Sequence, residues 1–198
     1  MIRKLATALA VVIVAALLGL GSAWWVLRYW PGAGFIAGGA WRTSTVAGSA
    51  DAGMYTRARV AITGLFALNK SEAIYLEAAR DDAGQPLRAQ CSYIVAGQTF
   101  DARWWSITAY ADDHFLIPNA AQRFSFNMGN LKVDGEGRFR FKTLPNDEGG
   151  DIPYVLPTGK GNGGFQLVLR LYNPSPAVVA GLHALRLPSI NTVGRCVL

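Results

Sequence analysis

The N-terminal apolar run constrains this chain most. Residues 5–27 read LATALAVVIVAALLGLGSAWWVL and contain no charged side chain, whereas Arg3 and Lys4 precede the run and Arg28 follows it. At helical rise such a run spans about 35 Å, enough to cross the roughly 30 Å hydrocarbon core of a bilayer. The run therefore predicts a transmembrane helix within residues 1–28.

Two interpretations of this segment remain open. A cleaved signal peptide would use the basic start, the apolar core and Gly21-Ser22-Ala23 as its cleavage site. A retained anchor is favoured because the run continues past that site into Trp24, Trp25, Tyr29 and Trp30, and aromatic rings favour the membrane interface. Both interpretations keep the basic N-terminus in the cytoplasm and export the remainder of the chain.

Charge and composition exclude some classes of partner. The formal net charge is +6, but Arg3 and Lys4 belong to the membrane signal, which leaves a net +4 on the exported part. Its basic residues are scattered and form no Lys/Arg run, so nucleic-acid binding is not supported.

Cys91 and Cys196 are the only cysteines. Export and the even number of cysteines favour a disulfide between them, which would pin the C-terminal tail and contribute about 2–4 kcal/mol. Two buried free thiols are the alternative. With only His114 and His183 as histidines and no C-x-x-C motif, we expect neither a metal site nor a cofactor.

The exported part begins with small residues and a helical pattern. Residues 29–50 are rich in Gly, Ala and small polar residues, which is typical of a linker. In residues 51–198, the predicted exported domain, three- and four-residue spacing first predicts an amphipathic helix with Asp51 as its N-cap and Gly64 near its end. The apolar stripe of this helix comprises Met54, Ala58, Ala61, Leu65 and Leu68.

From residue 72 onward the pattern favours strands. Residues 72–97 are predicted to form one β-hairpin, and residues 123–129 and 137–144 are predicted to form another around Asp134-Gly135. A further strand ends at Pro174 and Pro176. Short strands after one leading helix predict a mainly β fold, an antiparallel β-sandwich preceded by the amphipathic helix and the transmembrane helix.

The stretch from Ala102 to Asn119, ARWWSITAYADDHFLIPN, is the richest in side chains that could act chemically. Alternation on a strand separates two faces. The more apolar face, which we expect in the core, comprises Trp105, Ile107 and Ala109. The aromatic and hydroxyl face, which could stack a sugar or be covered by a second layer, comprises Trp104, Ser106, Thr108 and Tyr110. Asp112 and Asp113 are expected to form the turn that follows.

Known catalytic motifs are not matched. Ser106 lacks a G-x-S-x-G elbow, and residues 157–164, PTGKGNGG, have no Ser or Thr after Lys160 as a P-loop requires. Most carboxylates fall in predicted turns. No catalytic residue is assigned from the sequence.

The ordered motifs nevertheless resemble a bacterial family, domain of unknown function 1214. They are a W-S-I-T-x-Y strand, F-L-I-P-N, R-x-S, a D-G turn and L-R-L-Y-x-P. In this chain they occupy Trp105–Tyr110, Phe115–Asn119, Arg123 with Ser125, Asp134-Gly135 and Leu169–Pro174. The resemblance covers about residues 70–190. It implies a jelly-roll-like envelope protein, here in a short, membrane-anchored form without the family 1254 partner domain, and it implies no established reaction.

The expected protein is therefore a single-pass protein of the bacterial inner membrane, attached through residues 5–27, with a periplasmic domain. We expect a non-catalytic ligand-binding or envelope-assembly module, whose partner is a glycan, a lipid or a protein. The candidate ligand-binding residues are Trp104, Tyr110, His114, Asn119, Arg123 and Arg170. An enzyme acting on a carbohydrate or lipid-derived envelope substrate is the alternative, and a purely structural subunit of a membrane complex is a third possibility.

Overall fold

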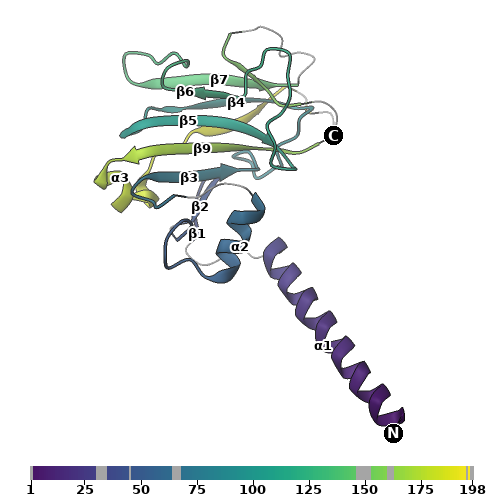
Figure 1. Ribbon diagram of the computed structural model, residues 1–198. Coiled ribbons are helices and arrows are strands. Elements are labelled where there is room, and N and C mark those ends of the chain that lie inside the picture. The colour runs from purple at the N-terminus through teal and green to yellow at the C-terminus, as the bar shows by residue number, and fades with distance from the viewer. Residues whose placement is uncertain are drawn as a thin grey trace.

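The computed structural model places a long N-terminal helix beside a two-layered β domain (Figure 1). It describes residues 2–29, 35–44, 46–63, 68–145, 153–159, 163–194 and 196. Helix α1 (Ile2–Tyr29) projects away from the domain, and none of its side chains is buried. By length and composition this helix could cross a membrane, as the sequence predicts.

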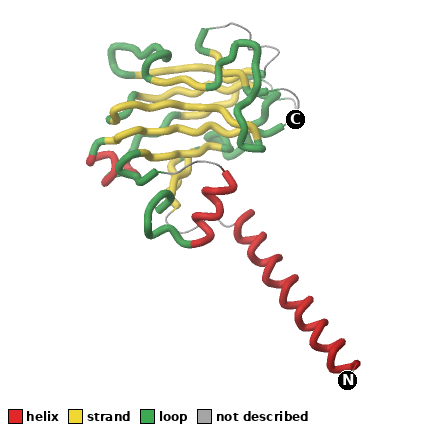
Figure 2. The backbone as a smooth tube through the Cα atoms, in the orientation of Figure 1, coloured by secondary structure: helices red, strands yellow, loops and turns green. Residues whose placement is uncertain are grey.

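The domain is a sandwich of two sheets, whose strands are yellow in Figure 2. The six-stranded sheet is antiparallel and contains, in spatial order, β1 (Phe35–Gly38), β2 (Trp41–Ser44), β3 (Ala73–Ala78), β9 (Phe165–Pro174), β5 (Ala102–Ala111) and β6 (Ser125–Asn127). The four-stranded sheet contains β10 (Ser189–Val193), β4 (Ser92–Gln98), β7 (Arg138–Leu144) and β8 (Val155–Pro157). Only the β7–β8 pair of these named strands is parallel. The predicted mainly β sandwich is therefore confirmed.

Three short helical elements complete the described fold: α2 (Met54–Thr63), α3 (Pro176–Ala180) and a 3₁₀ turn, η1 (Leu182–Ala184). Helix α3 begins where the sequence predicts that the last long strand ends. The hydroxyl of Ser175 accepts a hydrogen bond from the Val178 N–H at 3.3 Å, and Pro176 occupies the first turn, where its missing N–H costs nothing.

Alternation along the strands builds the core between the sheets. In β7, Phe139 and Phe141 are buried while Arg138 and Arg140 are exposed, so one side of this strand faces the core and the other faces solvent. In β5 the predicted core face, Trp105-x-Ile107-x-Ala109, is also buried. The two sheets meet where the Trp105 and Phe139 rings stack with their centroids 5.0 Å apart.

The first predicted hairpin forms its turn, but its predicted strand pairing is wrong. Strand β3 pairs with β9 in one sheet, and β4 pairs with β7 and β10 in the other, so the chain crosses the sandwich between them. The predicted turn itself forms, because the Asp81 N–H donates to the Gln85 carbonyl at 2.9 Å and the Leu87 N–H donates to the Ala79 carbonyl at 3.0 Å. Beyond it the chain leaves β3, and Ala89 and Cys91 are buried in the core before β4 begins. The apolar residues between β3 and β4 are therefore those of a chain that crosses from one sheet to the other through the core.

The second predicted hairpin is also wrong in its partners. Strand β6 pairs with β5, whereas β7 pairs with β4 in the opposite sheet. The Asp134-Gly135 turn does form, with the Gly137 N–H donating to the Asp134 carbonyl at 3.0 Å, but it closes only the isolated bridge between Val133 and Phe139. Leu131 is buried where the chain passes between the sheets.

The segment predicted as a linker, residues 29–50, is partly ordered as β1 and β2. Strand β2 pairs with β3 through Arg42 and Glu77. Trp41 is buried, and its indole N–H donates to the Pro188 carbonyl at 2.6 Å. The small residues that suggest a linker flank a strand that this tryptophan anchors.

Helix α2 forms where expected but begins later. Its first backbone bond runs from the Arg57 N–H to the Gly53 carbonyl at 3.0 Å, so Gly53 rather than Asp51 precedes the first turn. The predicted stripe residue Met54 is exposed to solvent. Gly64 and Leu65 lie outside the described residues.

Cys91 and Cys196 form a disulfide, as predicted, with their Cα atoms 4.9 Å apart. The bond joins residues 105 positions apart and holds the end of the chain beside the start of β4. Disulfides persist in oxidising compartments, so this bond agrees with export of the domain.

Candidate functional site

The outer face of the six-stranded sheet gathers polar and aromatic side chains from β3, β9 and β5. Arg170 on β9 lies opposite Tyr75 on one side and Ser106 on the other, and Tyr110 lies opposite Gln166. Residues directly opposite in antiparallel strands point to the same face of a sheet. We call the following set the Arg170 cluster: Tyr75, Glu77, Tyr110, His114, Gln166 and Arg170.

The guanidinium of Arg170 is held by its neighbours. It lies over the rings of Tyr75 and Tyr110, 5.8 Å and 5.3 Å from their centroids. It also donates to the Tyr110 hydroxyl at 2.9 Å and to the Thr108 hydroxyl at 3.4 Å. These contacts fix a positive charge at a half-buried position on the sheet.

His114 reaches the cluster from the turn after β5. Its backbone has φ 66°, a left-handed conformation that is uncommon for a residue with a Cβ. Its Nδ1 lies 2.8 Å from the Gln166 side-chain amide nitrogen. This hydrogen bond joins the loop after β5 to β9, and the tautomer of the ring sets which of the two nitrogens donates.

The turn itself depends on the two predicted turn aspartates. Asp112 accepts a hydrogen bond from the Gly164 N–H at 2.8 Å, and Asp113 accepts one from the Phe115 N–H at 3.0 Å. Both carboxylates therefore hold the loop that carries His114.

Glu77 is the electrostatically unusual member of the cluster. Burial raises the pKa of its carboxyl above the ordinary value of 4.5, and the charges of Arg59, His114 and Arg170 oppose that rise. Arg59 comes from α2, so the helix contributes to the field at this site. A carboxyl that resists ionisation beside histidine and arginine is a frequent feature of functional sites.

Trp104 lies on the same side of β5, one pair beyond Arg170, opposite Tyr172. Its side chain is 42% exposed. It could extend the surface of the cluster along the sheet.

Asn119 and Arg123 lie in the loop between β5 and β6. The Asn119 amide donates to the carbonyls of Ile117 and Arg123 at 3.0 Å each, and its oxygen accepts from the Arg123 N–H at 3.0 Å. Arg123 donates to the Val155 carbonyl on β8 at 3.0 Å. These bonds close the loop and tie it to the other sheet. Of the predicted ligand residues, the structure thus brings Tyr110, His114 and Arg170 into one cluster.

Sequence reasoning missed Tyr75, Glu77 and Gln166. Tyr75 and Glu77 are two residues apart in the predicted strand, and this spacing already places both side chains on the same face of the sheet. Their position beside Arg170 depends on β3 pairing with β9, whereas the sequence suggested a local hairpin partner.

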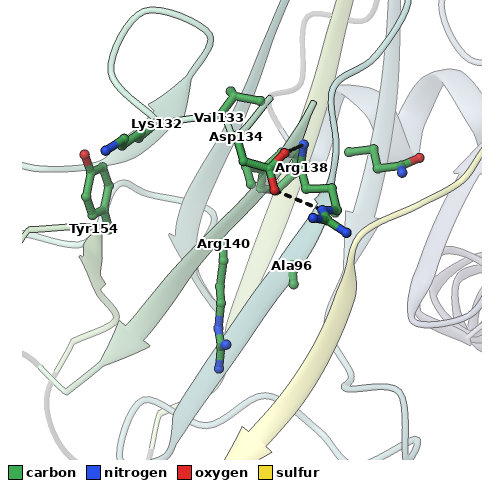
Figure 3. A pocket seen from close by; sticks show the side chains of 10 residues that line it. Ala96, Lys132, Val133, Asp134, Arg138, Arg140 and Tyr154 are labelled. Carbon is green, nitrogen blue, oxygen red and sulfur yellow. Dashed lines mark hydrogen bonds and ion pairs between the residues drawn. The ribbon is translucent and has the colours of Figure 1, made fainter. Parts of the chain in front are cut away.

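A second surface lies on the outer face of the four-stranded sheet, where a groove of about 640 Å³ opens (Figure 3). Arg138 forms ion pairs there with Asp134 at 2.9 Å and with Glu136 at 2.8 Å. Hydrogen bonds from the backbone and side chain of Arg138 lower the pKa of Asp134. The groove is lined by Ala96, Gly97, Gln98, Lys132, Val133, Asp134, Arg138, Phe139, Arg140 and Tyr154.

Within the described part of the chain, no three His, Cys, Asp or Glu side chains come together in a group that could hold a metal ion.

Comparison with known proteins identifies relatives of unknown function. Residues 72–176, more than half of the chain, match the family described as "Protein of unknown function (DUF1214)". Among proteins with curated functional descriptions, none matches.

Two solved structures are similar. The VPA0106 protein from Vibrio parahaemolyticus shares the fold with a TM-score of 0.60 at 22% identity, over 89% of this chain. The present chain spans 43% of that protein's length. A putative uncharacterized protein from Burkholderia cenocepacia matches with a TM-score of 0.39 at 12% identity. This match covers 64% of the present chain and 32% of the Burkholderia protein.

Proposed function

This chain belongs to the DUF1214 family, and we propose that it is a membrane-anchored envelope protein whose domain binds a hydroxyl-rich glycan at the Arg170 cluster. The partner is a glycan of the cell envelope. The protein holds it near the membrane without cleaving it.

The proposed location is the bacterial inner membrane, with the domain in the periplasm. Helix α1 is long and apolar enough to span the bilayer, and Arg3 and Lys4 at its start favour a cytoplasmic N-terminus. The disulfide between Cys91 and Cys196 supports an oxidising compartment for the domain.

The glycan is proposed from the chemistry of the cluster. Tyrosine rings offer flat apolar faces for the C–H groups of a sugar ring, while a carboxyl, an amide and a guanidinium exchange hydrogen bonds with its hydroxyls. The Arg170 cluster supplies all of these groups within one sheet face. The observation that carries the proposal is the fixed position of Arg170 between Tyr75 and Tyr110, because a preorganised group loses little freedom when a ligand binds.

The remaining predicted ligand residues have supporting roles in this proposal. Trp104 provides an exposed ring for a second sugar along β5. Asn119 and Arg123 hold the loop that follows His114.

Catalysis on such a glycan is the second candidate, and the raised pKa of Glu77 favours it. A carboxyl that stays protonated at higher pH can act as a general acid. Hydrolysis of a bound glycan, lost in Glu77→Gln, would favour this enzyme over the binding module.

The test is protection of histidine from chemical modification. The detergent-solubilised full chain is treated with diethyl pyrocarbonate in the presence of a panel of neutral and acidic oligosaccharides, and the modified residues are identified by mass spectrometry. His183 in the exposed turn η1 is an internal control. A binding glycan should protect His114 and leave His183 reactive. Equal modification of both histidines by a protein that binds the glycan would place the ligand elsewhere, and no binding across the panel would refute a glycan ligand.

A further inference from the structure

Helix α2 presents apolar side chains to solvent. Met54 is 78% exposed, Ile62 is 64% exposed and Tyr55 is 46% exposed. An amphipathic helix at the surface of a soluble domain normally turns its apolar side towards the core. Here Thr56 and Val60, two of the four half-buried positions of the helix, lie on the side opposite the exposed apolar residues.

The exposed residues form one continuous face. At about 100° per residue, Ala61, Met54, Ile62 and Tyr55 fall within roughly 120° of the helix circumference, with the small, half-buried Ala58 between Met54 and Ile62. Arg57 and Arg59 flank this face on its two sides. An apolar face bordered by arginines is the pattern of a helix that lies in the plane of a membrane interface.

We propose that this face of α2 is inserted into the lipid headgroup region and docks the domain on the membrane; this inference rests on the proposed anchoring by α1. The position of α2 favours a bilayer as the occupant, because α1 ends beside α2 (Figure 1). The same end of α1 carries the exposed rings of Trp24, Trp25 and Tyr29, which are typical of the interface.

The charges fit an anionic lipid surface. The guanidinium of Arg57 donates to the carbonyls of Ala50 and Ala52 at 2.9 Å and 2.8 Å, which fixes its charge at the border of the apolar face. Headgroup phosphates next to this face would meet positive charge on both sides.

Docking through α2 would also place the Arg170 cluster near the membrane surface. Arg59 on α2 acts on the Glu77 carboxyl in the Arg170 cluster. A bilayer in contact with α2 therefore lies next to the face of the sheet that carries the cluster, so a ligand would be bound close to the membrane surface.

The test uses the full chain in vesicles of phosphatidylcholine and phosphatidylglycerol that contain spin-labelled lipids. Both native cysteines are in the disulfide, so a single introduced cysteine can be labelled with a fluorophore. Met54→Cys and Ile62→Cys report on α2, and Leu17→Cys reports on α1. Met128→Cys is the matched control, an exposed methionine next to β6, at the opposite edge of the sheet from β1 and β2.

Docking predicts that lipid spin labels quench Met54→Cys and Ile62→Cys at least about twofold more than Met128→Cys, because an interfacial helix lies about 5–10 Å into the headgroup region. Quenching of Leu17→Cys with none at Met54→Cys or Ile62→Cys would overturn docking and leave the anchor intact. No quenching at Leu17→Cys would refute the anchor, and docking with it. Disulfide crosslinking of Met54→Cys between two chains without lipid quenching would place a second copy on this face and also overturn the proposal.

Discussion

The guanidinium of Arg170 donates a hydrogen bond of 2.9 Å to the hydroxyl of Tyr110 while lying 5.3 Å from the centroid of the same ring. The two residues come from neighbouring strands that lie about sixty positions apart in the sequence. Their contact fixes the long arginine side chain against the sheet, and it is the geometric centre of the proposed binding surface.

Tyr110→Phe should lower the free energy of unfolding by about 1–2 kcal/mol, because it removes the hydroxyl that accepts from a charged donor. Chemical denaturation of the detergent-solubilised chain measures the change. Tyr154→Phe is the matched control, since Tyr154 is 41% exposed at the edge of the groove. Equal effects of the two substitutions would show that the contact with Arg170 adds no stability.

Glu77→Gln should change how stability depends on pH. The folded carboxyl has a raised pKa, so the unfolded chain loses this proton first as the pH rises above about 4.5. Ionisation therefore favours the unfolded state, and stability should fall from that pH upward until the folded carboxyl is also ionised.

Glutamine cannot ionise, so Glu77→Gln should remove this part of the pH dependence and gain stability relative to the native chain at neutral pH. Thermal melts across the pH range measure it, with the exposed Glu72→Gln as control. A Glu77→Gln curve parallel to that of the native chain would contradict the pKa shift.

Loss of the disulfide should destabilise the domain by about 2–4 kcal/mol, because the bond closes a long loop in the unfolded chain. The double substitution Cys91→Ser with Cys196→Ser tests this in denaturation experiments. Reductant should destabilise the native chain and leave the double variant unchanged. Free thiols in the oxidised, unfolded native chain would show that the bond does not form.

Asn119→Ala should cost about 1–3 kcal/mol, since three hydrogen bonds that close the loop depend on its amide. Asn191→Ala at an exposed position of the edge strand β10 should stay within about 0.5 kcal/mol of the native chain. Similar small effects of both variants would mean that the loop does not depend on Asn119.

Sequence patterns predicted the faces of the strands better than their partners. Alternation identified Trp105 and Ile107 as core residues, because the side-chain period of a strand is fixed by geometry. The same period does not indicate which strand lies alongside. Pairing β3 with β9 therefore could not be predicted, nor could the approach of Glu77 to Arg170.

Helix α2 shows a related limit of sequence reasoning. The spacing of its apolar residues predicts an amphipathic helix whether the apolar side faces a core or a lipid surface. The exposure of Met54 and Ile62 favours a lipid-facing helix over a core-facing one. This exposure depends on which residues fill the core of the folded sandwich, and the spacing in the sequence does not show that.

The most direct test of the proposed function compares one arginine on each sheet. Once a binding glycan is found, isothermal titration calorimetry should show that Arg170→Lys weakens binding at least about tenfold, because lysine lacks the planar guanidinium that the two tyrosines hold. Arg140→Lys, in the groove of the other sheet, should leave the Kd unchanged. A loss of binding in Arg140→Lys with native affinity in Arg170→Lys would contradict the account and move the ligand to the groove.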